Sequence, residues 1–180
     1  RDSLFTVSSL MTTTGFCTAD YMTWKPLTWV NLLLVMLTGA SAGSTSGGIK
    51  MIRVVISAKA CYYEFKRLIH PSAVIPVRYN GHLVREDILT RVLAFTLLYL
   101  VVAAFGILVL AMSGMGFLES VGGMITCLGG VGPGLGLVGP AGNFHDIPEF
   151  SKWFLSLMML AGRLELYTIF LLFIPAFWKR

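Results

Sequence analysis

The stretch GASAGSTSGG, residues 39–48, interrupts what would otherwise be a continuous apolar helix. It follows PLTWVNLLLVMLT and precedes IKMIRVVISAKA. A membrane helix needs ~20 apolar residues to cross a hydrocarbon core of about 30 Å, so a helix that begins at Pro26 reaches only to Thr45. The ten small residues therefore lie at membrane depth. Irregular backbone is tolerated there only where it is buried in protein or lines a water-filled cavity.

The composition of the whole chain is also that of a membrane protein. Hydrophobic residues make up 56% of the 180 positions and charged residues only 13%, with a mean hydropathy of +0.76. Soluble domains carry about 25% charged residues. Residues 26–49 and 92–118 contain no charged side chain, and 153–178 is interrupted only by Arg163 and Glu165. We expect three membrane-spanning segments, of which the first and the last are irregular near their centre.

The basic residues are distributed unevenly along the chain. Eight of the 14 lysines and arginines fall within 50–91, and two more end the chain, whereas the connection at 17–25 holds one Asp and one Lys and that at 135–150 only Asp146 and Glu149. This is the positive-inside pattern of membrane proteins. It predicts a multi-pass protein in which 50–91 and the C-terminus are cytoplasmic. It also explains the net charge of +5 without a nucleic-acid partner.

A short helix followed by a glycine-rich loop is expected between the second and third spans. Residues 118–128 have helical character, but eleven residues of helix extend only ~16 Å, too little to cross the membrane. GGVGPGLG follows at once. Because both flanks are predicted to lie outside, this segment is interpreted as a re-entrant hairpin that enters the membrane from the outer side.

The N-terminal residues contain a second copy of this design. Residues 3–11 predict another short helix, which TTTGF and then the first span follow. Aligning Gly15 with Gly132 gives an offset of 117 residues, and MLTGAS at 36–41 then corresponds to MLAGRL at 159–164 after about six extra residues in the outer loop. A recurring order of elements indicates an internal repeat.

Glycine-containing loops at matching points of a repeat favour an ion filter. Rings of backbone carbonyls can replace the hydration shell of an ion, and the negative C-terminal ends of the short helices favour a cation. The alternative is that the glycines only let helices pack closely. The predicted fold class is an all-α membrane protein of span–pore-helix–filter-loop–span repeats, with re-entrant pore loops and one broken transmembrane helix.

Arg163 is the strongest electrostatic signal within a predicted span. An ionisable residue at membrane depth normally faces a cavity or a partner. Glu165 lies on a different helix face and is a poor direct partner for it. Two interpretations remain: a structural ion pair with another helix, or a guanidinium on an ion path that repels cations below the filter.

Nothing in the sequence indicates an enzyme. There is no H-E-x-x-H, no nucleophile elbow and no pair of carboxylates within a span. GLGLVG, residues 134–139, fits a dinucleotide-binding pattern, but no predicted strand precedes it. We therefore expect no catalytic residue and no bound cofactor.

Four motifs occur together in one order: TTTGF, GASAGSTSGGIKMIR, GVGPGLG and GRLELYTIFLLFIPAFWKR. They resemble the Trk/Ktr/HKT superfamily of potassium transporters, and GRLELYT and PAFWKR are most similar to its bacterial TrkH branch. Members have four repeats around one pore. The resemblance implies that this chain is the C-terminal part of a longer protein. Residues 1–69 would be the pore helix, filter loop and gate-interrupted second span of repeat three, 70–91 a cytoplasmic linker, and 92–180 repeat four.

The resemblance also implies roles for individual residues. Thr14 and Val131 would bind potassium through their backbone carbonyls, and Arg163 would be a barrier in the pore near the gate. Gly130 departs from the family pattern, in which Asn commonly precedes the Val-Gly of the fourth filter. The full filter set is Thr13, Thr14, Gly15, Val131, Gly132 and Pro133, and the gate loop consists of Gly39, Ala40, Ser41, Ala42, Gly43, Ser44, Thr45, Ser46, Gly47 and Gly48.

The function implied by the resemblance is potassium uptake across the bacterial inner membrane, as a channel or by symport, with K⁺ as the transported ion. The implied partners are a second copy in a homodimer, membrane lipid, and a cytosolic nucleotide-binding regulatory ring of the TrkA or KtrA type docked on 50–91. Two alternatives stay open. The chain could belong to a broken-helix secondary transporter for a small solute, or to a membrane subunit that does not conduct.

Overall fold

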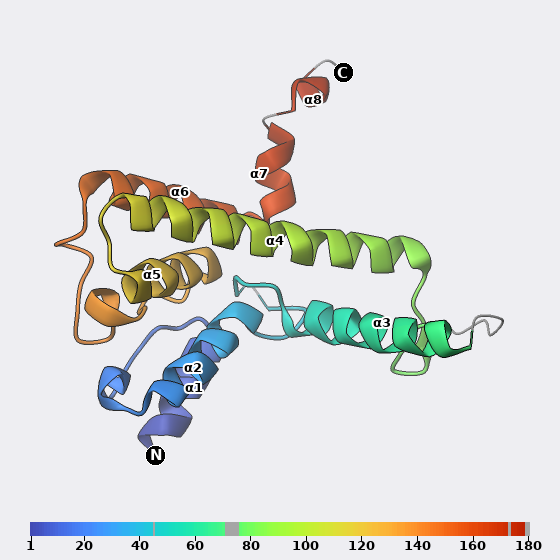
Figure 1. The fold of residues 1–180 in the computed structure, drawn as a ribbon, viewed down its shortest axis with the longest axis horizontal. Helices are drawn as coiled ribbons and strands as arrows, with labels where there is room; N and C mark the ends of the chain where they lie inside the picture. The colour runs from blue at the N-terminus through green and yellow to red at the C-terminus, as the bar shows by residue number, and fades with distance from the viewer. Residues whose placement is uncertain (45, 71–75, 173, 179–180) are drawn as a thin grey trace.

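The computed structural model describes residues 1–44, 46–70, 76–172 and 174–178, and the regular secondary structure of this part of the chain is helical apart from one small hairpin (Figure 1). Thr45 of the predicted gate loop, residues 71–75 of the predicted linker and the last two residues lie outside the described part. The helices are α1 Asp2–Met11, α2 Pro26–Thr38, α3 Met51–Ile69, α4 Glu86–Met112, α5 Phe117–Gly129, α6 Glu149–Arg163, α7 Leu166–Leu172 and α8 Pro175–Trp178, with short 3₁₀ turns η1 Tyr21–Thr23 and η2 Gly136–Val138.

Helix α4 is the long apolar rod expected from the charge-free segment at 92–118. Its 27 residues correspond to about 40 Å of helix. Among the described helices it alone is long and apolar enough to cross a membrane unbroken. Leu97, Phe105 and Leu108 are each more than 60% exposed. A helix that leaves so many large apolar side chains uncovered is suited to lipid or to further protein rather than to water.

The short helix α5 lies at the centre of the fold. It packs against α4, α6 and α2, and Figure 1 shows it beneath α4 and α6. Met124 and Leu128 on α5 are fully buried. Its 13 residues are too few to cross a membrane, as predicted for the re-entrant segment. A short helix enclosed in this way can hold the loop that follows it in a fixed position.

The order of elements in the N-terminal part matches that around α5. Helix α1 ends in a loop and is followed by α2, as α5 ends in a loop and is followed by α6. Pro26 occupies the first position of α2, where its missing N–H costs no hydrogen bond. The predicted short helices at 3–11 and 118–128 agree with α1 and α5 to within one residue at each end.

The chain breaks at the expected stretch and at one further position. Helix α2 ends at Thr38 and α3 begins at Met51. The second break separates α6 from α7, which are bent by 111° relative to each other, so α7 leaves the line of α6 in Figure 1. Glu165 in this break has a φ of +59°, a left-handed conformation that does not continue a right-handed helix. The prediction of one broken helix was therefore incomplete.

A two-stranded hairpin stands in the segment predicted as linker. Strands β1 Arg78–Tyr79 and β2 His82–Leu83 pair antiparallel. Asn80 and Gly81 connect them with φ values of +47° and +81°, and Asn-Gly is the strongest short hairpin signal. The Asn80-Gly81 pair is visible in the sequence, but the segment around it was predicted as a linker without a hairpin.

Gly162 provides a test of how tightly α6 packs on α5. A Cβ at Gly162 would overlap the carbonyl oxygen of Leu128, whereas a Cβ at Gly123 on α5 would meet only side-chain carbons at 3.9 Å. We expect Gly162→Ala to lower the free energy of unfolding by about 1–3 kcal/mol through overpacking. The matched variant Gly123→Ala should be neutral or stabilising by up to ~1 kcal/mol, because alanine is the better helix former. Thermal denaturation in detergent measures both, and equal melting temperatures would contradict the packing described.

Candidate functional site

The loops after α1 and α5 meet. Gly15 and Gly132 line one cavity of about 400 Å³, together with Pro133. A Cβ at Gly15 would overlap the Val131 carbonyl oxygen and would lie 3.2 Å from Pro133 Cδ. The contact therefore requires glycine at position 15. The structure thus brings together two predicted filter segments that lie 117 residues apart.

The two loops leave their helices in the same way. The Thr14 amide donates to the Ser9 carbonyl at 2.9 Å, and the Val131 amide donates to the Thr126 carbonyl at 2.9 Å. Adding the 117-residue offset to Ser9 and Thr14 gives Thr126 and Val131, so the two bonds occupy equivalent positions of the repeat. The internal repeat that the motifs indicated is therefore also present in the backbone hydrogen bonds.

The backbone angles follow the same correspondence. Thr13 and Gly130 have φ values of +54° and +65°, and Gly15 and Gly132 have values of +80° and +114°. Left-handed residues at these alternating positions end the right-handed helical path in both loops. Thr13 is a β-branched residue in a region that such residues rarely occupy.

Thr126 fixes the second loop from within α5. Its hydroxyl Oγ1 accepts from the Gly132 amide at 3.0 Å and donates to the Pro133 carbonyl at 3.0 Å. Its side chain is fully buried. Thr126 was not among the predicted site residues, although the 117-residue offset pairs it with Ser9 and so marks a hydroxyl at the same point of both short helices.

The predicted gate loop passes beneath the C-terminal end of α5. A Cβ at Gly47 would overlap the Gly129 carbonyl oxygen, so backbone packs directly on backbone there. Residues 46–48 are buried, whereas 41–43 on the opposite side of the loop are exposed. The Ser46 amide donates to the Ser44 hydroxyl at 3.1 Å. The loop is therefore held against α5 at one side and free of close packing at the other.

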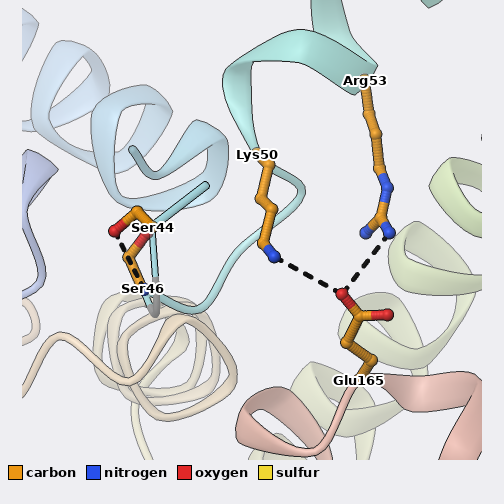
Figure 2. A network of polar contacts seen from close by, with 5 residues as sticks. All are labelled: Ser44, Ser46, Lys50, Arg53 and Glu165. Atoms are coloured by element: carbon orange, nitrogen blue, oxygen red, sulfur yellow. Dashed lines mark hydrogen bonds and ion pairs between the residues drawn. The ribbon is translucent and has the colours of Figure 1, made fainter. Parts of the chain in front are cut away.

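Two basic residues after this loop bind the carboxylate of the second break (Figure 2). Glu165 Oε1 lies 3.4 Å from Lys50 Nζ and 3.5 Å from Arg53 Nη2. The Arg53 guanidinium also lies over the Phe95 ring on α4, 3.9 Å from its centroid. This ion-pair cluster of Lys50, Arg53 and Glu165 joins the start of α3 to the break between α6 and α7.

Arg163 lies between the gate loop and the second glycine-containing loop. Its Nε is 3.6 Å from the position of a Cβ on Gly130. A cavity of about 300 Å³ is lined by Arg163 together with the ion-pair cluster and two serines of the gate loop, Ser44 and Ser46. Three cationic side chains and one carboxylate therefore line this cavity beside the gate loop, and their net positive charge disfavours a cation there.

Similarities to known proteins cover the whole chain. The family model TrkH, described as cation transport protein, matches residues 1–180. The potassium uptake protein TrkI of the Trk system of Halomonas elongata is 38% identical over 98% of this chain and 36% of its own length. TrkH of Escherichia coli K12, also a Trk system potassium uptake protein, is 37% identical over 99% of this chain and 37% of its own length.

A solved structure is equally similar. The crystal structure of the potassium transporter TrkH from Vibrio parahaemolyticus superposes with a TM-score of 0.89 at 36% identity, covering 98% of this chain and 37% of that one. The chain thus spans little more than a third of the length of the relatives it matches.

Thr126 can be tested by removing its hydroxyl without changing its shape. Thr126→Val leaves the Gly132 amide and the Pro133 carbonyl without their side-chain partner, and we expect a loss of about 1–3 kcal/mol in the free energy of unfolding. Thr126→Ser keeps the hydroxyl and should cost less. Thermal denaturation of the two purified variants measures the difference. Equal stability would mean that the hydroxyl does not hold the loop.

Proposed function

This chain belongs to the TrkH family of cation transport proteins, and from this premise we propose that it forms part of a potassium-uptake pore of the bacterial inner membrane. Proteins of this family are transporters and not enzymes. K⁺ is the transported ion in the proposal, and no cofactor is implied. Since relatives are almost three times as long, the complete pore is proposed to contain two further repeats.

One observation carries the proposal most directly: the loops after α1 and α5 meet, with matching hydrogen bonds and matching left-handed residues. Two glycine-containing loops at one point suit carbonyls arranged around a shared axis. In the proposal the filter carbonyls are those of Thr14 and Val131, with Thr13, Gly15, Gly132 and Pro133 shaping the backbone around them. The C-terminal ends of α1 and α5 contribute negative potential toward a cation.

The convergence of the loops also argues against the broken-helix secondary transporter. In that architecture, half-helix ends bind substrate at the interface of repeats that are often inverted. Here both repeats are predicted to enter the membrane from the same side, and both loops line one cavity. A non-conducting subunit has no evident need for paired loops held in strained conformations.

The gate is proposed to be the loop 39–48, with Arg163 as a barrier beside it. Small side chains on the exposed side of the loop impose little steric resistance to movement. The ion-pair cluster holds the end of this loop to the second break, and we propose that it favours the non-conducting position. K⁺ passing the filter would then meet the positive charges of Lys50, Arg53 and Arg163 until the loop moves.

Partners and orientation are inferred from the basic segment 50–91. We propose that it is cytoplasmic, that it meets anionic lipid head groups, and that it docks a nucleotide-binding regulatory ring. We also propose that the complete protein forms a homodimer. The Trk system named for the relatives supports the existence of such partners without naming them.

The filter assignment is tested in a bacterium that lacks its own potassium uptake, with the complete protein expressed from a plasmid. We expect Gly15→Ala and Gly132→Ala each to reduce K⁺ uptake roughly fivefold or more, the factor that corresponds to ~1–3 kcal/mol of backbone strain. Both glycines have positive φ. The control Gly123→Ala, at an uncrowded helical position, should support growth on low potassium as well as the wild type. Full rescue by both filter variants would reject the assignment.

The ion-pair cluster gives a test of the gate that leaves the filter unchanged. Glu165→Gln removes the charge that attracts Lys50 and Arg53, and we expect K⁺ flux into proteoliposomes to rise roughly twofold to fivefold, as for loss of a partly exposed ion pair. The K⁺/Na⁺ permeability ratio should not change.

The matched control for this test is Glu64→Gln, which removes the carboxylate paired with Arg67 on α3 at 3.0 Å. It should leave the flux at the wild-type value. A Glu165→Gln protein with unchanged or lower flux would contradict the proposed role of the cluster.

A further inference from the structure

A buried tyrosine of one repeat is hydrogen-bonded to the filter loop of the other. Tyr21 has no exposed surface, and its hydroxyl donates to the Gly134 carbonyl at 2.5 Å. Tyr21 begins the short turn η1 between α1 and α2. Gly134 directly follows Pro133, the last residue of the proposed filter set. The bond joins residues that are 113 positions apart.

The position of Tyr21 is fixed by its own neighbours. The Trp29 indole Nε1 donates to the Tyr21 carbonyl at 3.0 Å. Asp20 Oδ1 accepts from the Met22 amide at 2.9 Å and so caps the turn. The tyrosine also belongs to one apolar cluster with Leu10 of α1 and with Val131. Because both the backbone and the ring of Tyr21 are held, its hydroxyl can keep the Gly134 carbonyl in place.

Gly134 is the last of four consecutive residues whose peptide groups are fixed. The amides of Val131 and Gly132 bind Thr126, and the Pro133 carbonyl binds the same threonine. The Gly134 amide donates to the Val138 carbonyl at 2.7 Å. Of the bonds named for this loop, the one from Tyr21 comes from repeat three, whereas those from Thr126 and Val138 come from repeat four. It fixes the carbonyl end of the loop relative to the neighbouring repeat.

The tyrosine is a hydrogen-bond donor at any physiological pH. Burial raises the pKa of the Tyr21 phenol, and the nearby Cys17 and Asp20 raise it further. The phenol therefore stays neutral and retains its proton. The bond does not vary with external pH in the range where the carboxylates titrate.

We infer that Tyr21 is a positioning residue that sets the selectivity of the pore for K⁺ over Na⁺. The inference rests on the proposed function, because it assumes that the loop 131–133 contacts the ion. A smaller cation is bound well only if carbonyls move inward to meet it, and the bond to Gly134 restrains that movement. Without the bond, the loop can contract around Na⁺, and discrimination falls while the pore still conducts.

The test is the Tyr21→Phe variant of the complete protein in proteoliposomes, with K⁺ and Na⁺ permeabilities measured in the same vesicles. We expect the K⁺/Na⁺ permeability ratio to fall roughly threefold to tenfold, the factor that corresponds to the net contribution of one hydrogen bond. The matched control is Tyr99→Phe. Tyr99 is also buried, but its hydroxyl has no hydrogen-bond partner within the described residues, so the ratio should stay at the wild-type value.

A second variant covers the case in which Tyr21→Phe does not fold. Trp29→Phe keeps the Tyr21 hydroxyl and removes only the indole N–H that holds the Tyr21 backbone, so it should lower the permeability ratio by a smaller factor. A wild-type ratio in whichever of the two variants folds would overturn the inference. A wild-type protein that does not conduct K⁺ selectively would instead overturn the proposed function.

Discussion

A peptide group inside a lipid bilayer cannot bond to water, and this constraint governs where the chain departs from helix. The loop after α5 satisfies its amides and carbonyls with Thr126 and Val138. The gate loop satisfies part of its backbone with α2, where the Gly39 amide donates to the Val35 carbonyl at 3.0 Å, and the next residue after the loop, Ile49, donates to the Leu37 carbonyl at 3.1 Å. Each irregular segment therefore lies against α5 or α2 and not on the exposed side of α4. Non-helical backbone at membrane depth needs such enclosure.

The sequence predicted the helices well because their ends are marked by local chemistry. Pro26 begins α2, glycine follows α2 and α5, and the charge-free segment within α4 is unmistakable. It also predicted which loops meet, because the 117-residue offset is visible in the motifs. The sequence marked an irregularity in the last span through Gly162, Arg163 and Glu165, but not the sharp bend itself. The residue that adopts positive φ there is a glutamate whose side chain binds Lys50 and Arg53, more than 100 positions earlier.

The departure at Gly130 has a local explanation in the structure. Gly130 is the C-cap of α5, with φ +65° and ψ +33°. Glycine and asparagine are the two residues that most often occupy this left-handed position at the end of a helix. A glycine at the position where the resemblance implies asparagine therefore preserves the backbone path into the loop. The difference from asparagine is the loss of its amide side chain. The Arg163 Nε lies in the space that this side chain would reach, 3.6 Å from the position of a Cβ on Gly130.

The two repeats depend on each other more than their similar sequences suggest. Gly15 of the first contacts the Val131 carbonyl of the second, Gly47 contacts the Gly129 carbonyl, and Tyr21 donates to Gly134. All three contacts join a loop or turn of one repeat to the backbone of the other. They leave no room for a side chain at either glycine and no freedom for the tyrosine ring. Each repeat therefore supplies contacts that the other repeat cannot make by itself, so the pair, and not the single repeat, is the unit in which the site acquires its shape.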